Sequence, residues 1–125
     1  MALEFAATGE EGSYGFNIGN RVVDWRPMMR QILADIDQQT LAGIIAARFH
    51  NTLAEIIVAA ARIQPQKRVL LTGGCFQNKL LLEKTINLLR ESGFEPFWHR
   101  RIPPNDGGIA AGQVLAALKG KRKCA

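Results

Sequence analysis

Apolar residues recur along much of the chain at the spacing that places every third or fourth side chain on one face of a helix. This spacing predicts helices from Asp24 to about Ile36, from Thr40 to about Ile63 and from Asn78 to Glu91. The first residue of each is expected to cap its helix with a side-chain oxygen. The first helix should bury Trp25, Met28, Met29, Ile32 and Ile36, and the second carries the largest apolar stripe: Leu41, Ile45, Phe49, Leu53, Ile56, Ile57 and Ala60.

Shorter patterns fill the remaining segments. Met1 to Thr8 is typical of the last turns of a helix. Apolar and small or polar residues alternate from Tyr14 to Ile18, and Gly19-Asn20 supplies a tight turn, so we expect Arg21 to Val23 to pair back as a hairpin. A final helix is expected from about Asp106 to Leu118.

Two short apolar segments, Arg68–Thr72 and Phe94–Trp98, lie on either side of the helix that ends at Glu91 and predict strands. Strand, helix and strand in this order form a βαβ crossover, whose two strands run parallel. The chain of 125 residues has the length of one domain. We therefore expect an α/β fold with a small, partly parallel sheet flanked by helices.

The net charge of +5 is concentrated at the C-terminus, in Lys119, Lys121, Arg122 and Lys123; without these four, twelve basic residues face eleven acidic ones. We expect residues 1–118 to form the domain and residues 119–125 to be a solvated basic tail, with no nucleic-acid partner. No apolar run approaches the length of a membrane span and no signal peptide is present, so no membrane contact is expected. Cys75 and Cys124, far apart in sequence, fit a reducing, cytoplasmic environment.

Candidate chemistry begins at Gly73-Gly74, which follows the first predicted strand. Functionally, such a turn lets the backbone lie against a phosphate or nucleoside, while Asn78 at the next helix bonds a ribose or base. The alternative is a tight structural turn in which Asn78 is only a cap. The turn lies at the carboxyl end of a parallel strand, where open α/β sheets bind ligands. With this position taken into account, the ligand-binding and structural interpretations are equally supported.

A second turn, Pro103-Pro104-Asn105-Asp106-Gly107-Gly108, precedes the last helix. Asp106 is either a helix cap or a metal ligand. Because Asn105 is also able to cap, one of the two side chains is spare, and Gly107 leaves room for a ligand. We expect the two glycine turns to form one wall of a nucleotide and metal site.

Three other reactive side chains have ordinary structural explanations that we favour. His50 has no HxxxH or HxxE partner on its helix, which favours a packed or half-exposed histidine over a metal ligand. His99, at the end of the second strand, is expected to be structural or capping. Cys75 lacks an activating neighbour, so burial as a small apolar side chain is favoured. We also expect Arg100 and Arg101 to be solvated.

The segment Leu71–Glu83, followed by Gly93-Phe94, His99 and Pro103–Gln113, resembles the carboxyl end of the HypF hydrogenase maturation carbamoyltransferases. The similarity is strong from about Val69 to Gln113 and looser over residues 3–62. It implies that residues 1–118 are the C-terminal portion of a TsaD-like carbamoyltransferase domain. That domain has an actin-like ATPase fold, and this chain would be a fragment of its second lobe.

The resemblance also implies a function. Members of the family use carbamoyl phosphate and ATP to form carbamoyl-adenylate, and the carbamoyl group then passes to the C-terminal cysteine of HypE for cyanide ligand synthesis. Gly73, Gly74 and Asn78 match the adenosine-side turn, joined by Gly107, and Asp106 matches a ligand of a divalent metal, which would be zinc, iron or magnesium.

Parts of the family pattern are missing from the sequence. The family's HxxxH metal motif, its zinc-finger cysteines and its YrdC-like domain are absent, so we assign no catalytic residue and expect the fragment to be inactive alone. HypE and the remaining HypF domains are the implied partners. A nucleotide-binding module without chemistry, or an interaction scaffold, remains an alternative.

Overall fold

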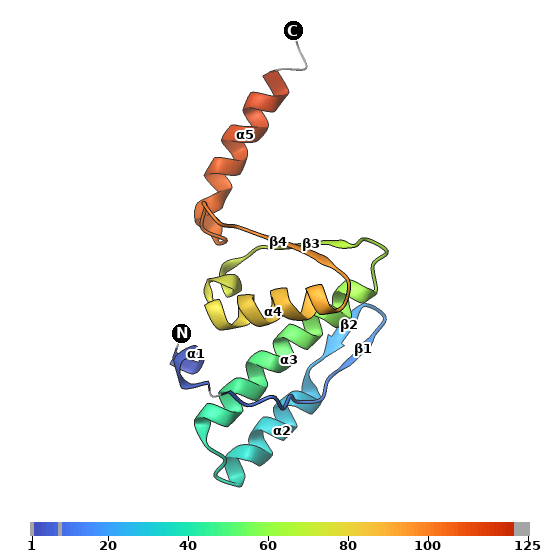
Figure 1. Ribbon diagram of the computed structural model, residues 1–125, viewed down its shortest axis with the longest axis vertical. Coiled ribbons are helices and arrows are strands. Elements are labelled where there is room, and N and C mark those ends of the chain that lie inside the picture. The colour runs from blue at the N-terminus through green and yellow to red at the C-terminus, as the bar shows by residue number, and fades with distance from the viewer. Residues whose placement is uncertain (1, 8, 122–125) are drawn as a thin grey trace.

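The structure is a computed structural model that describes residues 2–7 and 9–121. It contains five α-helices, four short strands and two 3₁₀ turns (Figure 1). In chain order they are α1 (Ala2–Ala6), β1 (Asn17–Gly19), β2 (Val22–Asp24), α2 (Arg26–Asp37), α3 (Ala42–Arg62), β3 (Arg68–Leu71), a 3₁₀ turn (Gly74–Gln77), α4 (Lys79–Glu91), β4 (Glu95–Trp98), a 3₁₀ turn (Asp106–Gly108) and α5 (Ile109–Lys121). Met1, Thr8 and residues 122–125 of the predicted tail lie outside the described residues, whereas Lys119 and Lys121 belong to α5.

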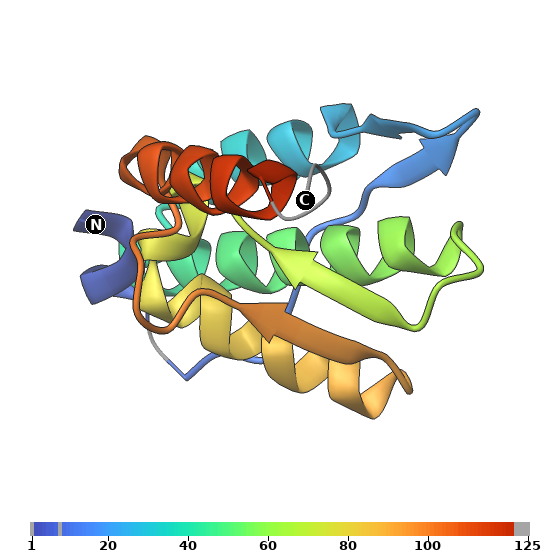
Figure 2. The same cartoon turned by 90° about the horizontal axis from the view of Figure 1, so that it is seen from above.

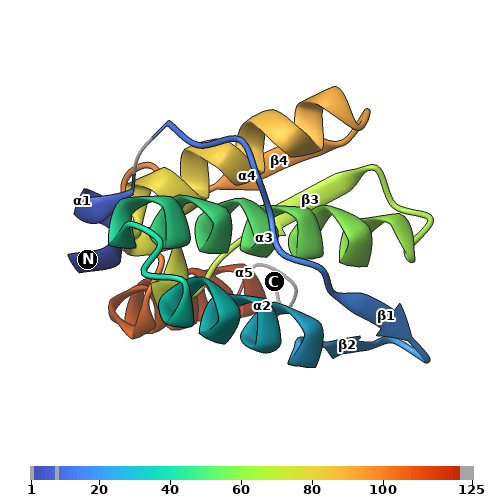
Figure 3. The same cartoon turned by 90° about the horizontal axis from the view of Figure 1, so that it is seen from below.

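Strands β3 and β4 pair in parallel, from Arg68 opposite Glu95 to Leu71 opposite Trp98, and α4 connects them. The predicted crossover and the mixed α/β fold are therefore confirmed. Helices α3 and α4 lie on one face of this sheet: the sheet is in front of them from above and behind them from below (Figures 2 and 3). The helix α5 stands on the other side and points away (Figure 1).

The core lies between α3, α4 and the inner face of the sheet, where Val58, Leu71, Ile86 and Leu89 form one buried cluster. The predicted stripe on α3 is only partly correct, because Leu41 is 71% exposed. The six buried residues of α3 are mostly small: Ala46, Ala47, His50, Thr52, Ala54 and Val58. Small side chains allow helices to approach closely, so the most deeply buried face of α3 is its alanine-rich face rather than its face of large apolar residues.

The hairpin forms, but its turn lies one residue later than predicted. Asn20 and Arg21 both have positive φ, at 51° and 63°, and Gly19 pairs with Val22 across them. Two central residues with φ > 0 match the twist of the strands in a two-residue hairpin, and asparagine tolerates this conformation well. Residue 21 therefore belongs to the turn, and the second strand begins at Val22.

Two of the predicted caps are wrong. Asp24 ends β2 and accepts a hydrogen bond from the backbone N–H of Arg26 at 3.1 Å, while Trp25 occupies the cap position of α2. Thr40 belongs to the turn that closes α2, where its N–H donates to the carbonyl of Asp35, and α3 begins after Leu41 without a side-chain cap. Helix α2 also buries less than predicted: Met28 is buried, but Trp25, Met29 and Ile36 are exposed.

The helix α3 has 21 residues and a mean hydropathy of 1.3, so by length and composition it is apolar enough to cross a membrane, contrary to the expectation from sequence. The central helix of a folded domain has the same character. Here α3 packs against α1, α2 and α4 and buries His50 and Thr52, whose side chains are both hydrogen-bonded within the domain.

Candidate functional site

The first glycine turn leaves β3 through a conformation that favours glycine. Gly73 has φ 107° and ψ 157°, a region that side-chain-bearing residues rarely adopt. The chain then makes the 3₁₀ turn from Gly74 to Gln77 and enters α4 at Asn78, whose Oδ1 accepts a hydrogen bond from the N–H of Leu81 at 2.9 Å. The predicted cap by Asn78 is confirmed.

The second turn is built on Asn105. Its Oδ1 accepts from the N–H of Gly107 at 3.0 Å, and its carbonyl accepts from the N–H of Gly108 at 3.0 Å. A Cβ on Gly107 would stand 3.0 Å from Asn105 Oδ1, so the turn needs this glycine whatever it binds. Because Asn105 is the cap, the exposed carboxylate of Asp106 has no capping role and is available to a ligand. The metal-ligand alternative for Asp106 requires this.

The two turns are in contact at the carboxyl ends of the parallel strands. The N–H of Gly73 donates to the carbonyl of Pro104 at 2.7 Å. A Cβ on Gly74 would lie 4.0 Å from Cβ of Asn105, which is ordinary contact. One hydrogen bond thus holds the backbone of both predicted motifs together at one edge of the sheet.

A carboxylate that the sequence analysis missed covers part of the helix terminus. Oε1 of Glu4, in α1, accepts from the N–H groups of Lys79 and Leu80 at 2.7 and 3.2 Å. Those two donors of α4 are therefore already satisfied by an anion. Over the described part of the chain, the N–H groups of Gly74 and Cys75 have no protein acceptor, so the donors still free lie on the glycine turn rather than on α4.

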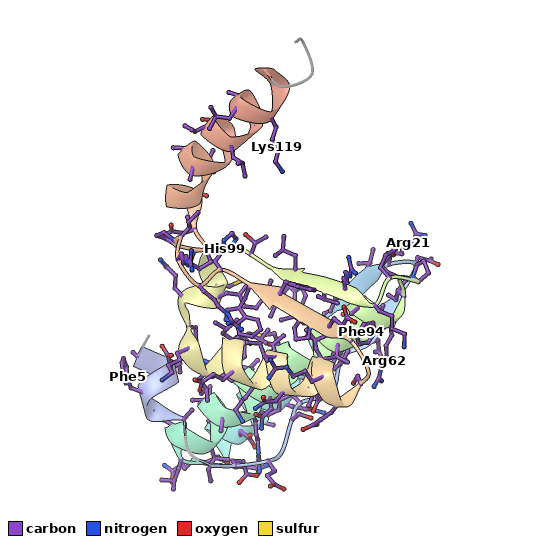
Figure 4. All side chains as sticks on the ribbon, turned by 45° about the horizontal axis from the view of Figure 1, so that its top comes forward. Phe5, Arg21, Arg62, Phe94, His99 and Lys119 are labelled. Carbon is purple, nitrogen blue, oxygen red and sulfur yellow. The ribbon has the colours of Figure 1, made fainter. Side chains whose placement is uncertain are left out.

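The predicted secondary candidates have definite places. His99 Nε2 lies 3.1 Å from Thr72 Oγ1, across the ends of the two parallel strands and next to the glycine turn (Figure 4). Cys75 is exposed, contrary to the prediction of burial, because the 3₁₀ turn directs it away from the core. The guanidinium of Arg100, expected to be solvated, stacks on Trp98 at 4.5 Å from the ring centroid.

The described residues do not form a complete metal site. Within the ranges 2–7 and 9–121, no group of three or more His, Cys, Asp or Glu side chains is placed to hold one ion. His50, one of the two histidines, is buried on α3 and hydrogen-bonded to Asn78 at 2.8 Å. Asp106 therefore belongs to no set of three or more such side chains within the described residues.

Comparison with known proteins identifies this arrangement. Residues 1–113 match the family described as carbamoyltransferase, Kae1-like domain, second subdomain. The chain is similar to carbamoyltransferase HypF of Synechocystis sp., with 40% identity over 116 residues that cover 90% of this chain and 15% of that protein. It is also similar to carbamoyltransferase HypF of Rhizobium leguminosarum bv. viciae, with 39% identity over 82% of this chain and 14% of the relative.

Solved structures give the same result. The crystal structure of full-length HypF in the phosphate- and nucleotide-bound form matches 94% of this chain and 16% of its own, with a TM-score of 0.85 and 34% identity. T. kodakarensis HypF, at 23% identity and a TM-score of 0.73, shows the same fold. This chain therefore spans about 15% of the length of the two curated relatives named above. It belongs to the HypF carbamoyltransferase family, as part of the second subdomain of the Kae1-like domain.

Proposed function

We propose that this chain supplies the adenosine-side wall of the carbamoyl-transfer site of a HypF-type enzyme. The observation that carries the proposal is the hydrogen bond from Gly73 N–H to Pro104 O, which joins the two turns at the strand ends. Open α/β sheets bind ligands at that edge. A similar solved structure is a nucleotide-bound form of HypF, which supports a nucleotide as the ligand here.

In this proposal the complete enzyme is cytoplasmic and uses ATP and carbamoyl phosphate to form carbamoyl-adenylate. The carbamoyl group then passes to the C-terminal cysteine of HypE, where it becomes the source of the cyanide ligands of [NiFe]-hydrogenases. HypE and the remaining HypF domains are the proposed partners. This chain would contribute binding and positioning to the reaction, and the reacting groups would come from other parts of the enzyme.

The proposed roles of the turn residues follow from their positions. Gly74 carries no Cβ and has a free N–H, so a phosphate or ribose oxygen can approach its backbone directly. Asn78 presents a side-chain amide at the end of the same turn. Gly107 has no Cβ, so a ligand can approach the backbone beside the Asp106 carboxylate. The same glycine is required by the Asn105 turn.

Asp106 is proposed as one ligand of a divalent cation, either zinc, iron or magnesium. An exposed carboxylate with no hydrogen-bond partner among the described residues is suited to a hard cation. A single carboxylate with water binds such ions weakly, and the two histidines of the family's HxxxH motif would have to come from elsewhere in the enzyme. The cation would polarise or neutralise anionic oxygens of the nucleotide.

The substitution Asp106→Asn tests this role in the complete carbamoyltransferase. Since Asn105 provides the cap, we expect the variant to keep its stability and its carbamoyl-adenylate formation while losing transfer to the HypE cysteine. Transfer is measured by mass spectrometry of HypE, and Asn105→Ala is the control for the cap, expected to cost about 1 kcal/mol of folding free energy. Full transfer by a folded Asp106→Asn enzyme would reject the metal role.

A further inference from the structure

His50 is almost completely buried in α3, at 2% exposure, yet both of its ring nitrogens are hydrogen-bonded. Nδ1 lies 2.7 Å from the carbonyl oxygen of Ala46, and Nε2 lies 2.8 Å from Nδ2 of Asn78. A carbonyl oxygen only accepts, so Nδ1 carries the ring proton. Nε2 of the neutral ring is then the acceptor for the Asn78 amide.

Asn78 consequently stands in a series of three hydrogen bonds that has a single direction. Leu81 N–H donates to Asn78 Oδ1 at 2.9 Å, Asn78 Nδ2 donates to His50, and His50 donates to Ala46. Turning the amide over would place its NH₂ against another N–H and its oxygen against the Nε2 lone pair, which breaks both bonds. The series therefore fixes the orientation of the Asn78 side chain as well as its position.

The close packing of α3 against α4 makes this contact possible. Ala46 and Ala47 are fully buried, and Ala54 is 2% exposed, so short side chains occupy the face of α3 that packs within the domain. Because no long side chains separate the helices, the imidazole on α3 reaches Asn78, the N-cap residue of α4. A buried polar network of this kind specifies one arrangement when all of its members are satisfied.

Two hydrogen-bonding groups of Asn78 are left over once these bonds are made. Each amide oxygen has two lone pairs and each amide nitrogen two hydrogens, and the protein uses one of each. One donor and one acceptor thus remain on a half-buried side chain that ends the glycine turn. This pair suits a nucleoside such as adenosine, whose ribose hydroxyls donate and accept and whose ring nitrogens accept.

We propose that His50 is a positioning residue of the nucleotide site, which holds the Asn78 amide in the one orientation that leaves this donor and acceptor for the nucleoside. The inference rests on the proposed nucleotide contact of Asn78. His50 itself does not touch the ligand and ligates no metal in this arrangement. It acts by removing the rotational freedom that Asn78 would otherwise lose on binding.

The test compares three buried substitutions in the complete carbamoyltransferase, with ATP affinity measured by calorimetry. His50→Leu keeps bulk but removes the acceptor, and we expect ATP affinity to fall about tenfold, the worth of one hydrogen bond. His50→Gln restores an acceptor near Nε2, and its affinity is expected within about threefold of the parent. Thr52→Val is the matched control: it is equally buried on α3, but its hydroxyl bonds Arg48 and Tyr14, so it should lower stability and leave ATP affinity unchanged.

The combination with Asn78→Ala separates this inference from the proposed function. If His50 acts through Asn78, the double variant binds ATP as weakly as Asn78→Ala and no more weakly. Additive losses, or equal losses in His50→Leu and Thr52→Val, would overturn the positioning role. If Asn78→Ala weakens binding while His50→Leu does not, the inference alone fails; if Asn78→Ala has no effect, the proposed nucleotide contact fails.

A measurement on the unsubstituted protein covers the case in which His50→Leu does not fold. Imidazole ¹⁵N chemical shifts distinguish a ring protonated on Nδ1 from one protonated on Nε2. The hydrogen-bond series requires the proton on Nδ1, facing Ala46. A ring that carries its proton on Nε2 could not accept from Asn78, and this result would overturn the proposal.

Discussion

The adjacent residues Gly73 and Gly74 differ in whether the backbone conformation requires glycine. Gly73 has a φ of 107°, while a Cβ on Gly74 would meet only Cβ of Asn105 at an ordinary 4.0 Å. We expect Gly73→Ala to lower the free energy of unfolding by about 1–3 kcal/mol through backbone strain. Gly74→Ala should leave stability nearly unchanged and weaken ATP binding in the complete enzyme.

Urea unfolding measures the first effect and calorimetry the second, with Gly112→Ala as the control, since a Cβ there has open space around it. If Gly74→Ala binds ATP with the affinity of the parent, the absence of a Cβ at this position has no role in the site. A large loss of stability in Gly74→Ala would show instead that packing between the turns explains the glycine.

Tyr14, the only tyrosine of the chain, has an unusually weak acid group. Burial, followed by the hydrogen bond of its hydroxyl to Asp35 at 2.7 Å and the charge of that carboxylate, raises its pKa to about 12. The pKa is raised on folding, so the contribution of Tyr14 to stability is present in full below about pH 10 and is lost as the pH rises through 12. The phenolate absorbance of the folded protein should therefore rise near pH 12.

The same titration in concentrated urea is expected near pH 10, the ordinary value for tyrosine. The variant Asp35→Asn serves as control, since without the carboxylate charge the pKa of Tyr14 in the folded protein should move back toward the ordinary value. Circular dichroism recorded along the titration shows that the chain is still folded. A midpoint near 10 in the folded protein would contradict the hydrogen bond to Asp35.

At the scale of elements, the N-terminus of α4 is stabilised from a distant part of the chain. The carboxylate of Glu4 accepts from the N–H groups of Lys79 and Leu80 and places a negative charge at the positive end of the helix dipole. Glu4→Gln keeps an acceptor oxygen but removes the charge, and we expect it to lower the free energy of unfolding by about 0.3–1 kcal/mol. Glu4→Ala should cost more, because it also removes the acceptor.

Chemical unfolding at low and high salt checks this expectation, since salt screens the charge and should reduce the effect of Glu4→Gln. Glu11→Gln, at an exposed glutamate with no ion pair among the described residues, is the neutral control. An effect of Glu4→Gln that equals that of Glu11→Gln would mean that α1 does not cap α4.

The elements that the sequence predicted well depend on local signals. The strands β3 and β4, their parallel pairing and the end of α4 at Ser92-Gly93 follow from apolar runs and from a glycine with φ 79°. The caps of α2 and α3 were predicted wrongly because Asp24 lies one residue before the cap position and bonds Arg26 from there, while Thr40 bonds within the turn that follows α2. Local sequence patterns do not determine which of several neighbouring residues occupies the cap position.

The parts of the site that sequence missed are long-range contacts. Glu4 reaches α4 across 75 positions, and His50 reaches Asn78 across 28. No spacing rule relates these pairs. The two glycine turns were predicted to form one wall of a site, and the structure places them in contact. They meet because each follows one of two parallel strands, whose carboxyl ends lie at one edge of the sheet. For His50 the sequence favoured a packed or half-exposed side chain; the structure buries it and shows the partner, Asn78, that no sequence pattern indicated.

At the scale of the whole molecule, large apolar side chains are exposed on the outer face of the β3–β4 sheet and on α5. On the outer face of the sheet, Leu70 and Phe97 pair with each other and are 64% and 51% exposed. On α5, four large apolar side chains are more than half exposed: Ile109, Val114, Leu115 and Leu118. Large apolar side chains exposed side by side, as Leu70 and Phe97 are, mark contact with other protein. It agrees with a chain that spans about 15% of its relatives, in which further segments are available to cover it.

The same incompleteness bears on the activity of the chain by itself. One wall of a site binds a nucleotide weakly, and the described residues hold no group of three or more metal-ligating side chains. We therefore expect the chain by itself to show no turnover of ATP or carbamoyl phosphate. Catalysis needs groups placed on both sides of the reacting atoms, and here one side is solvent. The measurement is ATP–pyrophosphate exchange by the purified chain, compared with its Asp106→Asn, Asn78→Ala double variant to subtract contaminating activity. If the purified chain shows exchange above that of the double variant, the wall is itself an active site. The proposal that the reacting groups come from other parts of the enzyme would then be wrong.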